Sequence, residues 1–536
     1  MLILGINQGA GASVVAMADG RPLFALEEER VQRRKGCSGF PVQALTFTLD
    51  YLKLNPASVD AVMMTGGADA AQVMDARAAL DRQGLAGIPM MDCDRHTAHA
   101  ASAYYGRRTD VGAPYLVLSL DEGGDGCSAA VHIGEKGGLR RIAATPETDS
   151  VTRLFGAVTD MMGMVPGLHD YKLMGLAPYA DPDRWAGPLA ILRSYLDLDP
   201  TDPLRFRRKV PEPMAEIGPR LARDLQKVRF DHLAGAAQAF AEDLIARWVR
   251  ASIAASGIRR VVVAGSAFMN VKVNKVLAEI EGIDSFDAFP SCGSESLAFG
   301  AAWLAGRRLN PSWNEGPVFD DPCLGPDALY DFDTAQAAFR NRLRFERLEA
   351  AEDRIAELLA QGHVVARCSG RMEFGARALG NRSLLADPAD HGVTVRLNRL
   401  IKQRDFWMPF APAIPLERLD DYIRIPACLP RPWVSPYMMH AFDTTPLRQD
   451  FPAATHPYDG TARVQAVPAA LYPGLHAVLS GFAARTGRAA LLNTSFNRHG
   501  EPIVMGAHDA MTVLAETDLG HLVIGDWLVT KPEAGI

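Results

Sequence analysis

The sequence predicts a two-domain α/β protein. Its 536 residues exceed what a single hydrophobic core usually supports and match two domains of roughly 200–300 residues each. Short apolar runs typical of strands alternate with longer segments of helical periodicity in both halves of the chain. Residues 309–329 are rich in Pro, Asp and Gly and show no periodicity, which indicates a linker. We therefore predict one domain over residues 1–325 and a second over residues 326–536.

Composition and charge exclude several classes of partner. Hydrophobic residues make up 48% of the chain, charged residues 22%, and the net charge is −7, so we expect no nucleic-acid partner. No run approaches the roughly 20 apolar residues of a membrane span, and no signal peptide precedes the first predicted strand. The seven cysteines are scattered without CxxC spacing. These features predict a cytoplasmic protein with reduced thiols and no membrane partner.

Two hairpins with Gly- and Asp-rich turns organise the first predicted domain. Their strands are short: residues 2–7, 12–18 and 22–27 in the first hairpin, and residues 115–120 and 127–133 in the second. A third unit runs from residues 261–263 through Gly265 into a helix. Before it, residues 233–248 carry an apolar stripe of period about 3.6. This order resembles the layout of an actin/Hsp70-like (ASKHA) nucleotide-binding domain, which we predict for residues 1–325.

The densest cluster of polar residues lies in the second predicted domain. A helix over residues 351–361 and a strand over residues 363–367 lead into the sequence GRMEFGARALGNRS, residues 370–383. Arginine presents a planar fork that matches phosphate or carboxylate, and glycines let backbone N–H groups approach an anion. Two further cations, Lys402 and Arg404, follow close behind.

Many arginine clusters are only solvated basic loops, and that interpretation is the alternative here. The spacers between these arginines are apolar, however, and include Phe374, Ala378 and Leu379. A partly buried loop follows from such spacers, and buried arginines without an anion would leave unpaired charges. We therefore favour a site for phosphate-bearing ligands.

Several long motifs resemble one known family. GRMEFGARALGNRSLLADP, LNRLIKQRDFWMPFAP, DGTARVQAV and LLNTSFNRHGEPIV resemble the YrdC-like domain of the O-carbamoyltransferases of antibiotic and nodulation-factor biosynthesis. EEER with Lys35, LDEGGDG, DYKLMGLAPY and residues 265–274 are similar to the other domain of that family, which is related to tRNA threonylcarbamoyladenosine synthase. The resemblance spans nearly the whole chain. It implies an actin-like N-terminal domain and a YrdC-like α/β C-terminal domain.

The resemblance implies a two-step carbamoyl transfer. The C-terminal domain would bind ATP and carbamoyl phosphate with Mg²⁺, form carbamoyl-adenylate, and release pyrophosphate and phosphate. A small-molecule acceptor would then take the carbamoyl group in the N-terminal domain and release AMP. Guanidinium groups and exclusion of water suit an anionic, short-lived substrate. The resemblance also implies a homodimer.

The expected site residues follow from matching positions in the family motifs. For carbamoyl phosphate and ATP they are Arg371, Glu373, Arg377, Arg382, Ser383, Lys402, Arg404, Arg463, Asn493, Thr494, Ser495 and Asn497. For adenylate in the N-terminal domain they are Lys35, Arg95, Asp121, Gly123, Gly124, Asp125, Gly265, Asn270 and Asn274. The expected catalytic residues are Arg371, Arg377, Lys402, Arg404 and Lys172. Beside Lys172, the apolar Met174, Leu176 and Pro178 are expected to pack in the core.

The N-terminal half departs from the family at its centre. Ala10 stands where the family has a histidine suited to acid–base work. The family also holds an iron-type metal ion with two histidines at i and i+4, an Asp in the second hairpin and an Asp before the last helix. This chain keeps His99 and Asp121 but has Arg95 and Ser294 at the other two positions.

Two interpretations of that centre remain open. Ligation could have shifted by one residue, with His96 and Glu295 joining His99 and Asp121 around one metal ion. Alternatively, the metal is lost and Arg95 supplies a fixed positive charge, which we favour because several departures fall in one site. His96 on its own could also be a core histidine.

The missing histidine leaves the acceptor open as well. A hydroxyl is expected from the family, and an amine or hydroxylamine would need less assistance from a base. A different class of function is a nucleotide- and carbamoyl-phosphate-binding partner subunit with a remodelled N-terminal site.

Overall fold

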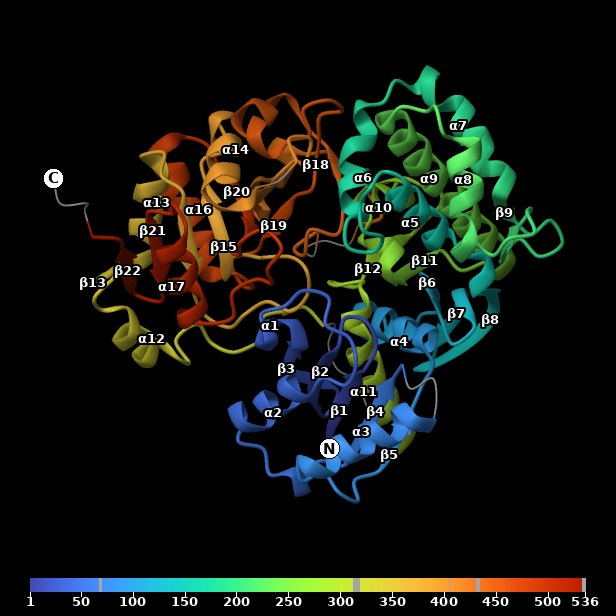
Figure 1. Ribbon diagram of the computed structural model, residues 1–536, viewed down its shortest axis with the longest axis horizontal. Coiled ribbons are helices and arrows are strands. Elements are labelled where there is room, and N and C mark those ends of the chain that lie inside the picture. The colour runs from blue at the N-terminus through green and yellow to red at the C-terminus, as the bar shows by residue number, and fades with distance from the viewer. Residues whose placement is uncertain (67–69, 312–318, 404, 430–433, 533–536) are drawn as a thin grey trace. The chain divides into compact units, whose positions relative to one another are not determined.

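The computed structural model describes residues 1–66, 70–311, 319–403, 405–429 and 434–532 (Figure 1). Two compact units share these residues. The first unit comprises Met1–Leu23, Ser38–Phe319 and Pro426–Pro430. The second comprises Phe24–Cys37, Asp320–Ile425 and Arg431–Ile536. Both units contain sheets covered by helices, so the predicted α/β class is confirmed.

Two five-stranded sheets form the frame of the first unit. One has the order β3-β2-β1-β4-β5, with strands β1 (Leu2–Asn7), β2 (Ser13–Ala18), β3 (Arg21–Glu27), β4 (Ala61–Thr65) and β5 (Met90–Asp92). The other has the order β12-β11-β6-β7-β8, with strands β6 (Tyr115–Gly124), β7 (Cys127–Glu135), β8 (Gly138–Pro146), β11 (Arg260–Ala264) and β12 (Ser285–Ala288).

The two sheets repeat one topology. In each, the first strand pairs antiparallel with the second along the chain and parallel with the fourth, which pairs parallel with the fifth. Both predicted hairpins are therefore present, and β11, which ends just before Gly265, takes the same place in its sheet that β4 takes in the other. This duplicated arrangement agrees with the predicted actin/Hsp70-like domain.

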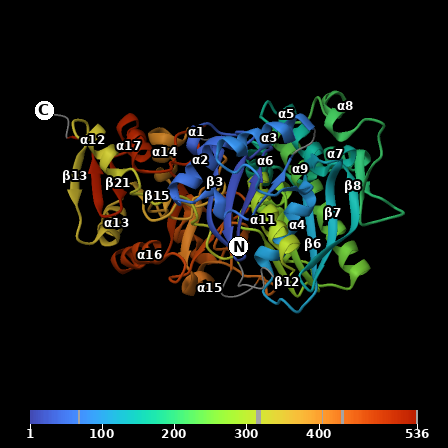
Figure 2. The ribbon, with the colours of Figure 1, turned by 90° about the horizontal axis from the view of Figure 1, so that it is seen from below.

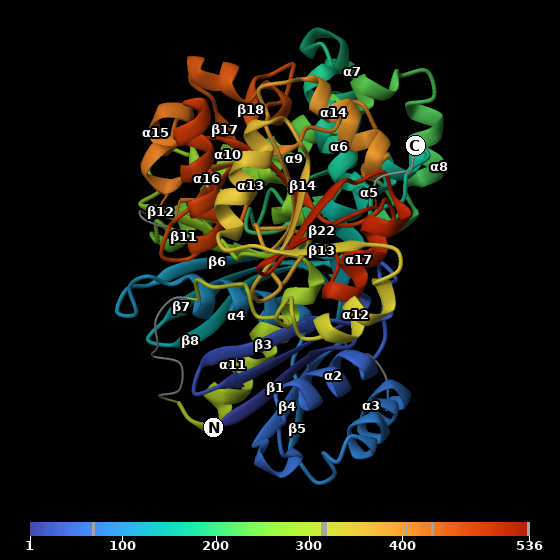
Figure 3. The same ribbon diagram turned by 90° about the vertical axis from the view of Figure 1, so that its left-hand side faces the viewer.

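Helices α4 (Arg95–Arg107) and α11 (Leu297–Leu309) pack against each other between the sheets (Figure 3). α4 packs on β6 and β11, and α11 packs on β1 and β4. Glycines make the close packing feasible: a Cβ at Gly5 would overlap the carbonyl oxygen of Ala298, and one at Gly300 would overlap that of Ala98. The start of α4 thereby lies beside the ends of β1 and β6, where the site is built.

The remaining elements of the first unit lie around this frame. They are α2 (Val42–Tyr51), α3 (Ala70–Arg82), α5 (Val151–Met161), α6 (Asp170–Leu176), α7 (Pro182–Tyr195), α8 (Gly218–Asp224), α9 (Phe230–Ser256), α10 (Val271–Ala278) and the short strands β9 (Leu196–Leu198) and β10 (Phe206–Arg208). The predicted apolar stripe of residues 233–248 lies in α9. Its Leu244 and Trp248 are fully buried, which confirms that periodicity.

One eight-stranded sheet is the centre of the second unit. Its order is β13-β22-β21-β14-β15-β20-β16-β19, with strands β13 (Arg344–Arg347), β14 (Val365–Cys368), β15 (Arg382–Ala386), β16 (Ala411–Pro415), β19 (Gln465–Val467), β20 (Leu491–Ser495), β21 (His521–Ile524) and β22 (Trp527–Thr530). The smaller strands β17 (Phe442–Asp443) and β18 (Thr461–Ala462) pair with each other.

Helices cover both faces of this sheet. They are α12 (Phe332–Phe339), α13 (Ala351–Ala360), α14 (Gly392–Leu397), α15 (Leu419–Tyr422), α16 (Pro473–Thr486) and α17 (Ala507–Glu516), with α1 (Glu28–Gln32) in the segment from the first part of the chain. Figure 2 shows α12 and α17 on one face and α13 and α16 on the other. The predicted helix of residues 351–361 is α13. The strand after it starts at Val365, two residues later than predicted, because Gly362 turns the chain with a φ of 84°.

All seven cysteine thiols are free, and six of the seven are buried. Within the described residues, every helix is too short or too polar to span a lipid bilayer.

Candidate functional site

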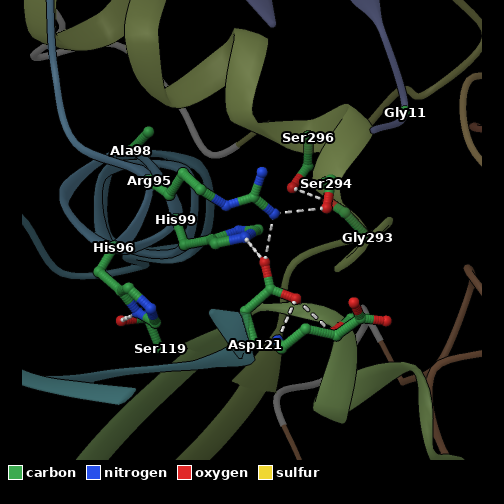
Figure 4. Close-up of polar contacts among 12 residues, drawn as sticks. Gly11, Arg95, His96, Ala98, His99, Ser119, Asp121, Gly293, Ser294 and Ser296 are labelled. Atoms are coloured by element: carbon green, nitrogen blue, oxygen red, sulfur yellow. Dashed lines mark hydrogen bonds and ion pairs between the residues drawn. The ribbon is translucent and has the colours of Figure 1, made fainter. Parts of the chain in front are cut away.

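Asp121 is the centre of a polar cluster in the first unit (Figure 4). It lies near the end of β6 and is 1% exposed. Its Oδ2 atom accepts hydrogen bonds from Arg95 Nη2 at 2.8 Å and His99 Nε2 at 3.1 Å. Its Oδ1 atom accepts from the Glu122 N–H at 2.9 Å and from the Ser266 hydroxyl. Four protein donors therefore occupy both carboxylate oxygens.

These donors decide the charge of Asp121. Burial alone would raise the pKa of its carboxyl, but the hydrogen bond from His99 and the charge of Arg95 hold that pKa well below its usual value. The carboxylate is therefore ionised at neutral pH and can only accept hydrogen bonds. His99 Nε2 must carry the proton that it shares with Oδ2.

Arg95 is the first residue of α4, and local contacts hold that turn in place. The N-cap residue Asp94 accepts a hydrogen bond from the Thr97 N–H at 3.0 Å, and Asp125 accepts one from the Arg95 N–H at 2.8 Å. The same Nη2 atom that bonds Asp121 also donates to the Ser294 hydroxyl at 2.9 Å. The guanidinium thus bridges the second hairpin and the segment before α11, as Figure 4 shows.

His96 and Glu295 face other partners. Both ring nitrogens of His96 are engaged, Nδ1 with the Ser119 hydroxyl at 2.9 Å and Nε2 with the Cys127 carbonyl oxygen at 3.1 Å. Burial, and then the neighbouring His99, lowers the pKa of His96 to about 4, so its ring is neutral. Glu295 accepts a hydrogen bond from the Ser291 hydroxyl. Figure 4 shows His96 on the Ser119 side of α4, away from the Arg95 guanidinium.

The iron-type metal ion that the family resemblance implies does not fit these residues. Arg95 and Ser294 occupy two of the four ligand positions, and the oxygens of Asp121 are already bonded to protein donors. In the parts of the chain that the structure describes, no three His, Cys, Asp or Glu side chains form a group that could hold a metal ion. These contacts do not support the alternative ligand set in which His96 and Glu295 join His99 and Asp121.

The turn at Ala10 has no side chain that replaces the family histidine. Asn7, at the end of β1, donates to the carbonyl oxygens of Ala10 at 2.8 Å and Gly11 at 3.0 Å, and its own oxygen accepts from the Thr65 hydroxyl. Ala10 itself is exposed. The turn is therefore well ordered but offers no acid or base.

Glu122 is a titratable group of this site that the sequence analysis did not single out. Burial, and then the adjacent charge of Asp121, raises the pKa of its carboxyl, and Asp170 adds to the effect. Its Oε1 would lie 2.8 Å from a Cβ placed at Gly167. The pKa of Asp170 is also raised by burial. These shifts depend on burial and on neighbours distant in sequence, so the motif DEGGDG alone could not reveal them.

The other predicted residues of the first unit have mostly structural contacts. Asn270 caps α10 by accepting from the Val273 N–H at 3.1 Å, and Asn274 donates to the Phe268 carbonyl oxygen at 2.7 Å. A Cβ at Gly265 would overlap the Leu120 carbonyl oxygen, so this glycine allows β11 to approach β6.

Gly123 lies against the side chain of Glu147. Lys172 is partly exposed in α6. Lys35 is exposed and lies in Phe24–Cys37, the segment that belongs to the second unit.

In the second unit, Glu373 organises the loop between β14 and β15. Its Oε1 atom accepts three backbone hydrogen bonds, from Leu379 at 2.8 Å, Asn381 at 2.7 Å and Arg382 at 3.1 Å. Its side chain is 2% exposed. Glu373 Oε1 therefore positions this loop by accepting three of its backbone N–H groups.

Two of the predicted anion-binding arginines donate to backbone carbonyls. Arg382 is fully buried and donates to five carbonyl oxygens, those of Pro326, Ser369, Gly370, Asn381 and Met505. Arg371 donates to the carbonyl oxygens of Leu324 and Gly325. The premise that these buried arginines need an anion does not hold for Arg382, because carbonyl oxygens satisfy its donors.

Other predicted residues converge where β15 pairs with β20. Ser383 lies directly opposite Ser495, and Thr494 opposite Leu384. The Lys402 ammonium donates to the Ser495 hydroxyl at 3.0 Å and to the Asn497 side-chain oxygen at 2.8 Å.

Asn493 connects the loop between β14 and β15 to this strand pair. Its side-chain amide donates to the Ala378 carbonyl oxygen at 3.2 Å, next to Arg377. Arg377 and Arg463 are both partly exposed, and Arg404 lies outside the described residues.

Comparisons with known proteins cover both halves of the chain. Residues 78–303 match the family described as Carbamoyltransferase N-terminus, and residues 356–531 match that described as Carbamoyltransferase C-terminus. The chain is 30% identical over 455 residues to nodulation protein NolO of Bradyrhizobium diazoefficiens, covering 83% of this chain and 80% of that protein.

A second relative is matched over nearly its whole length. The chain is 25% identical over 549 residues to 3'-hydroxymethylcephem-O-carbamoyltransferase of Streptomyces clavuligerus, covering 98% of each chain. Among solved structures, full-length HypF in a phosphate- and nucleotide-bound form aligns with 13% identity and a TM-score of 0.36, covering 58% of this chain and 47% of that one.

Proposed function

Because the chain belongs to the carbamoyltransferase family, we propose that it transfers a carbamoyl group from carbamoyl phosphate to a small-molecule acceptor by way of carbamoyl-adenylate. The adenylate forms in the second unit, from ATP and carbamoyl phosphate with Mg²⁺. The first unit then uses it to carbamoylate the acceptor, and AMP is released. Residues 326–536 are the proposed domain for adenylate formation, and residues 1–325 are the proposed domain for carbamoyl transfer.

One observation supports the first step above the others. Arg377, Ser383, Lys402 and Ser495 come from separate segments, yet hydrogen bonds and strand pairing join those segments at one place on the sheet. Glu373 and Arg382 hold the intervening loop rigid. A cationic, preorganised loop of this kind stabilises negative charge that develops during phosphoryl transfer.

The first step can be written with all atoms accounted for. Water cleaves carbamoyl phosphate to carbamate and phosphate, and a carbamate oxygen then attacks the α-phosphorus of ATP and displaces pyrophosphate. Arg377, Lys402 and Arg463 are the proposed cations for the phosphate groups. Ser383, Asn493, Thr494, Ser495 and Asn497 are the proposed polar contacts to the carbamoyl group and ribose. Mg²⁺ would neutralise phosphate charge.

In the second step the acceptor hydroxyl attacks the carbamoyl carbon, and the bond to the adenylate oxygen breaks. The hydroxyl proton needs an acceptor, and Ala10 supplies none. We propose Glu122 as the general base, because it is half-buried next to Asp121, whose Oδ1 accepts its backbone N–H, and burial raises the pKa of its carboxyl. The relative named for a hydroxymethylcephem substrate supports a hydroxyl acceptor. A hydroxyl requires such a base more than an amine does.

Pyrophosphate release from ATP, with and without carbamoyl phosphate, tests the first step. We expect release that requires carbamoyl phosphate and falls at least ~100-fold in Lys402→Met. Ligand binding without pyrophosphate release, in folded protein, would instead identify a binding subunit.

Carbamoylated product from a set of small hydroxyl compounds, detected by mass spectrometry, tests the second step. Glu122→Gln should lose this product and keep pyrophosphate release. Glu135→Gln, a substitution at an exposed residue of β7, is the matched control and should keep both.

A further inference from the structure

The guanidinium of Arg95 belongs to the polar cluster around Asp121, which also includes His99, Ser266 and Ser294. In the family, residues at four positions hold the metal ion. At three of these positions, the side chains of this chain lie within hydrogen-bonding distance of the Arg95 guanidinium or of its partner Asp121. Asp121 and Ser294 both bond Nη2, and His99 bonds the same carboxylate oxygen as Arg95. The guanidinium itself comes from the fourth position.

Arg95 already balances the charge of Asp121 without a metal ion. The ionised Asp121 is paired with Arg95 at 2.8 Å, and its remaining lone pairs accept from Ser266, His99 and the Glu122 N–H. A divalent cation would have to displace these donors and would then repel the adjacent guanidinium. His99 offers no help, because its Nε2 is directed at Asp121 and not at a free ligand position.

The backbone around Arg95 is shaped for this side chain. A Cβ at Gly124 would overlap Arg95 Cδ and would lie 2.9 Å from its Nε, so the hairpin packs directly against the arginine stem. A Cβ at Gly9 would lie 3.2 Å from Nη1, so the first hairpin turn also faces the guanidinium. The Ser294 side chain is short enough to leave room for the guanidinium, and its hydroxyl still accepts a hydrogen bond from it.

We propose that the Arg95 guanidinium stands in for the divalent metal ion, and that the first unit of this carbamoyltransferase works without a metal. Asp121, which ligates metal in the family pattern, serves here to hold a protein cation. His99 donates a hydrogen bond to the same Asp121 oxygen that Arg95 contacts, and the Ser294 hydroxyl accepts one from Arg95. The positive charge is thereby built into the chain and does not depend on metal supply.

The test restores the family's ligand pattern and measures metal binding directly. Full-length wild-type protein and the double variant Arg95→His/Ser294→Asp are dialysed against Mn²⁺, without nucleotide, and bound metal is measured by mass spectrometry. Arg95→Gln/Ser294→Asp is the matched control, because it removes the guanidinium without adding a histidine. Thermal unfolding in Mn²⁺ is the second readout.

We expect the wild type to hold less than ~0.1 equivalents of metal, as purified and after dialysis, and to show no Mn²⁺-dependent shift of its unfolding midpoint. The Arg95→His/Ser294→Asp variant should bind about one equivalent, with a midpoint raised by roughly 5–10 °C at 100 times its Kd. Adding His99→Asn to that variant should abolish binding.

Stoichiometric metal in the wild type that disappears in His99→Asn would overturn the proposal. Should the double variant fail to fold, the wild-type metal content and its response to His99→Asn decide the question alone. Neither readout depends on carbamoyl transfer, so failure of the proposed activity and failure of this inference are distinguishable.

Discussion

Gly124 lies directly against the side chain of Arg95, so that any β-carbon at position 124 would overlap the arginine Cδ. The φ of Gly124 is 148°, a conformation that residues with a β-carbon rarely adopt. The second hairpin and the first turn of α4 are therefore interlocked. This relationship makes the position of the guanidinium depend on a glycine far from it in sequence.

The first prediction concerns this glycine. Gly124→Ala should push the Arg95 side chain away from Asp121 and lower the free energy of unfolding by about 2–4 kcal/mol, through overlap and backbone strain. Gly126→Ala is the matched control: Gly126 also has a positive φ, of 76°, but no described residue places an atom within 4 Å of where its new methyl group would lie. Chemical denaturation measures both, and an equal effect of the two substitutions would contradict the interlock.

The second prediction separates the charge of Arg95 from its shape. Arg95→Gln removes the cation beside a buried carboxylate and should cost about 2–4 kcal/mol of unfolding free energy. Arg95→Lys keeps the charge, but its ammonium ends one bond short of the Nη2 position and lacks the planar guanidinium, so an intermediate loss is expected. Carbamoyl-phosphate-dependent pyrophosphate release should stay within about twofold of wild type in both variants, because that step is assigned to the second unit. Abolished release would refute this division.

The third prediction is a pH dependence from His96. Its pKa is lowered from 6.5 to about 4 in the folded protein, so the folded state favours the neutral ring. The stabilisation is complete above pH 6.5 and is lost as the pH falls towards 4, by about 3 kcal/mol in total. His96→Asn should lose this part of the slope of unfolding midpoint against pH between 6.5 and 4. His499→Asn, at an exposed histidine, should keep the wild-type slope.

The fourth prediction contrasts two arginines of the second unit. Arg382→Met leaves five carbonyl oxygens without their donor in a fully buried place and should lower the free energy of unfolding by about 3–5 kcal/mol. Arg377→Met, at a partly exposed residue, should change it by less than about 1 kcal/mol and still reduce pyrophosphate release at least ~100-fold. Similar stability losses in both would show that Arg377 is structural.

Sequence patterns predicted the fold well where the signal was local. The hairpins of the first unit and the buried stripe of α9 depend on alternation, turn residues and helical period, which neighbouring residues determine. The approach of Arg95, His99 and Asp121 could be expected because their motifs matched positions of one family site.

Contacts between distant segments could not be predicted in the same way. The donors of Arg382 are satisfied by carbonyls at Pro326 and Met505, and backbone carbonyls have no sequence signature. Glu373 stood among apparent ligands in the motif, but its oxygen accepts three backbone N–H groups of a loop whose path only the fold defines. The raised pKa of Glu122 arises from burial beside Asp121, which a charge pattern alone does not reveal.

The placement of α11 has a consequence for synthesis of the chain. The sheet that starts with β1 is completed on its inner face by this helix, whose preceding turn bonds β2 through Ser13 and Glu295, 282 residues apart. During translation the apolar face of that first sheet stays exposed to solvent until nearly the whole first unit has left the ribosome. Truncations that end before residue 297 should therefore leave this face of the sheet exposed and aggregate.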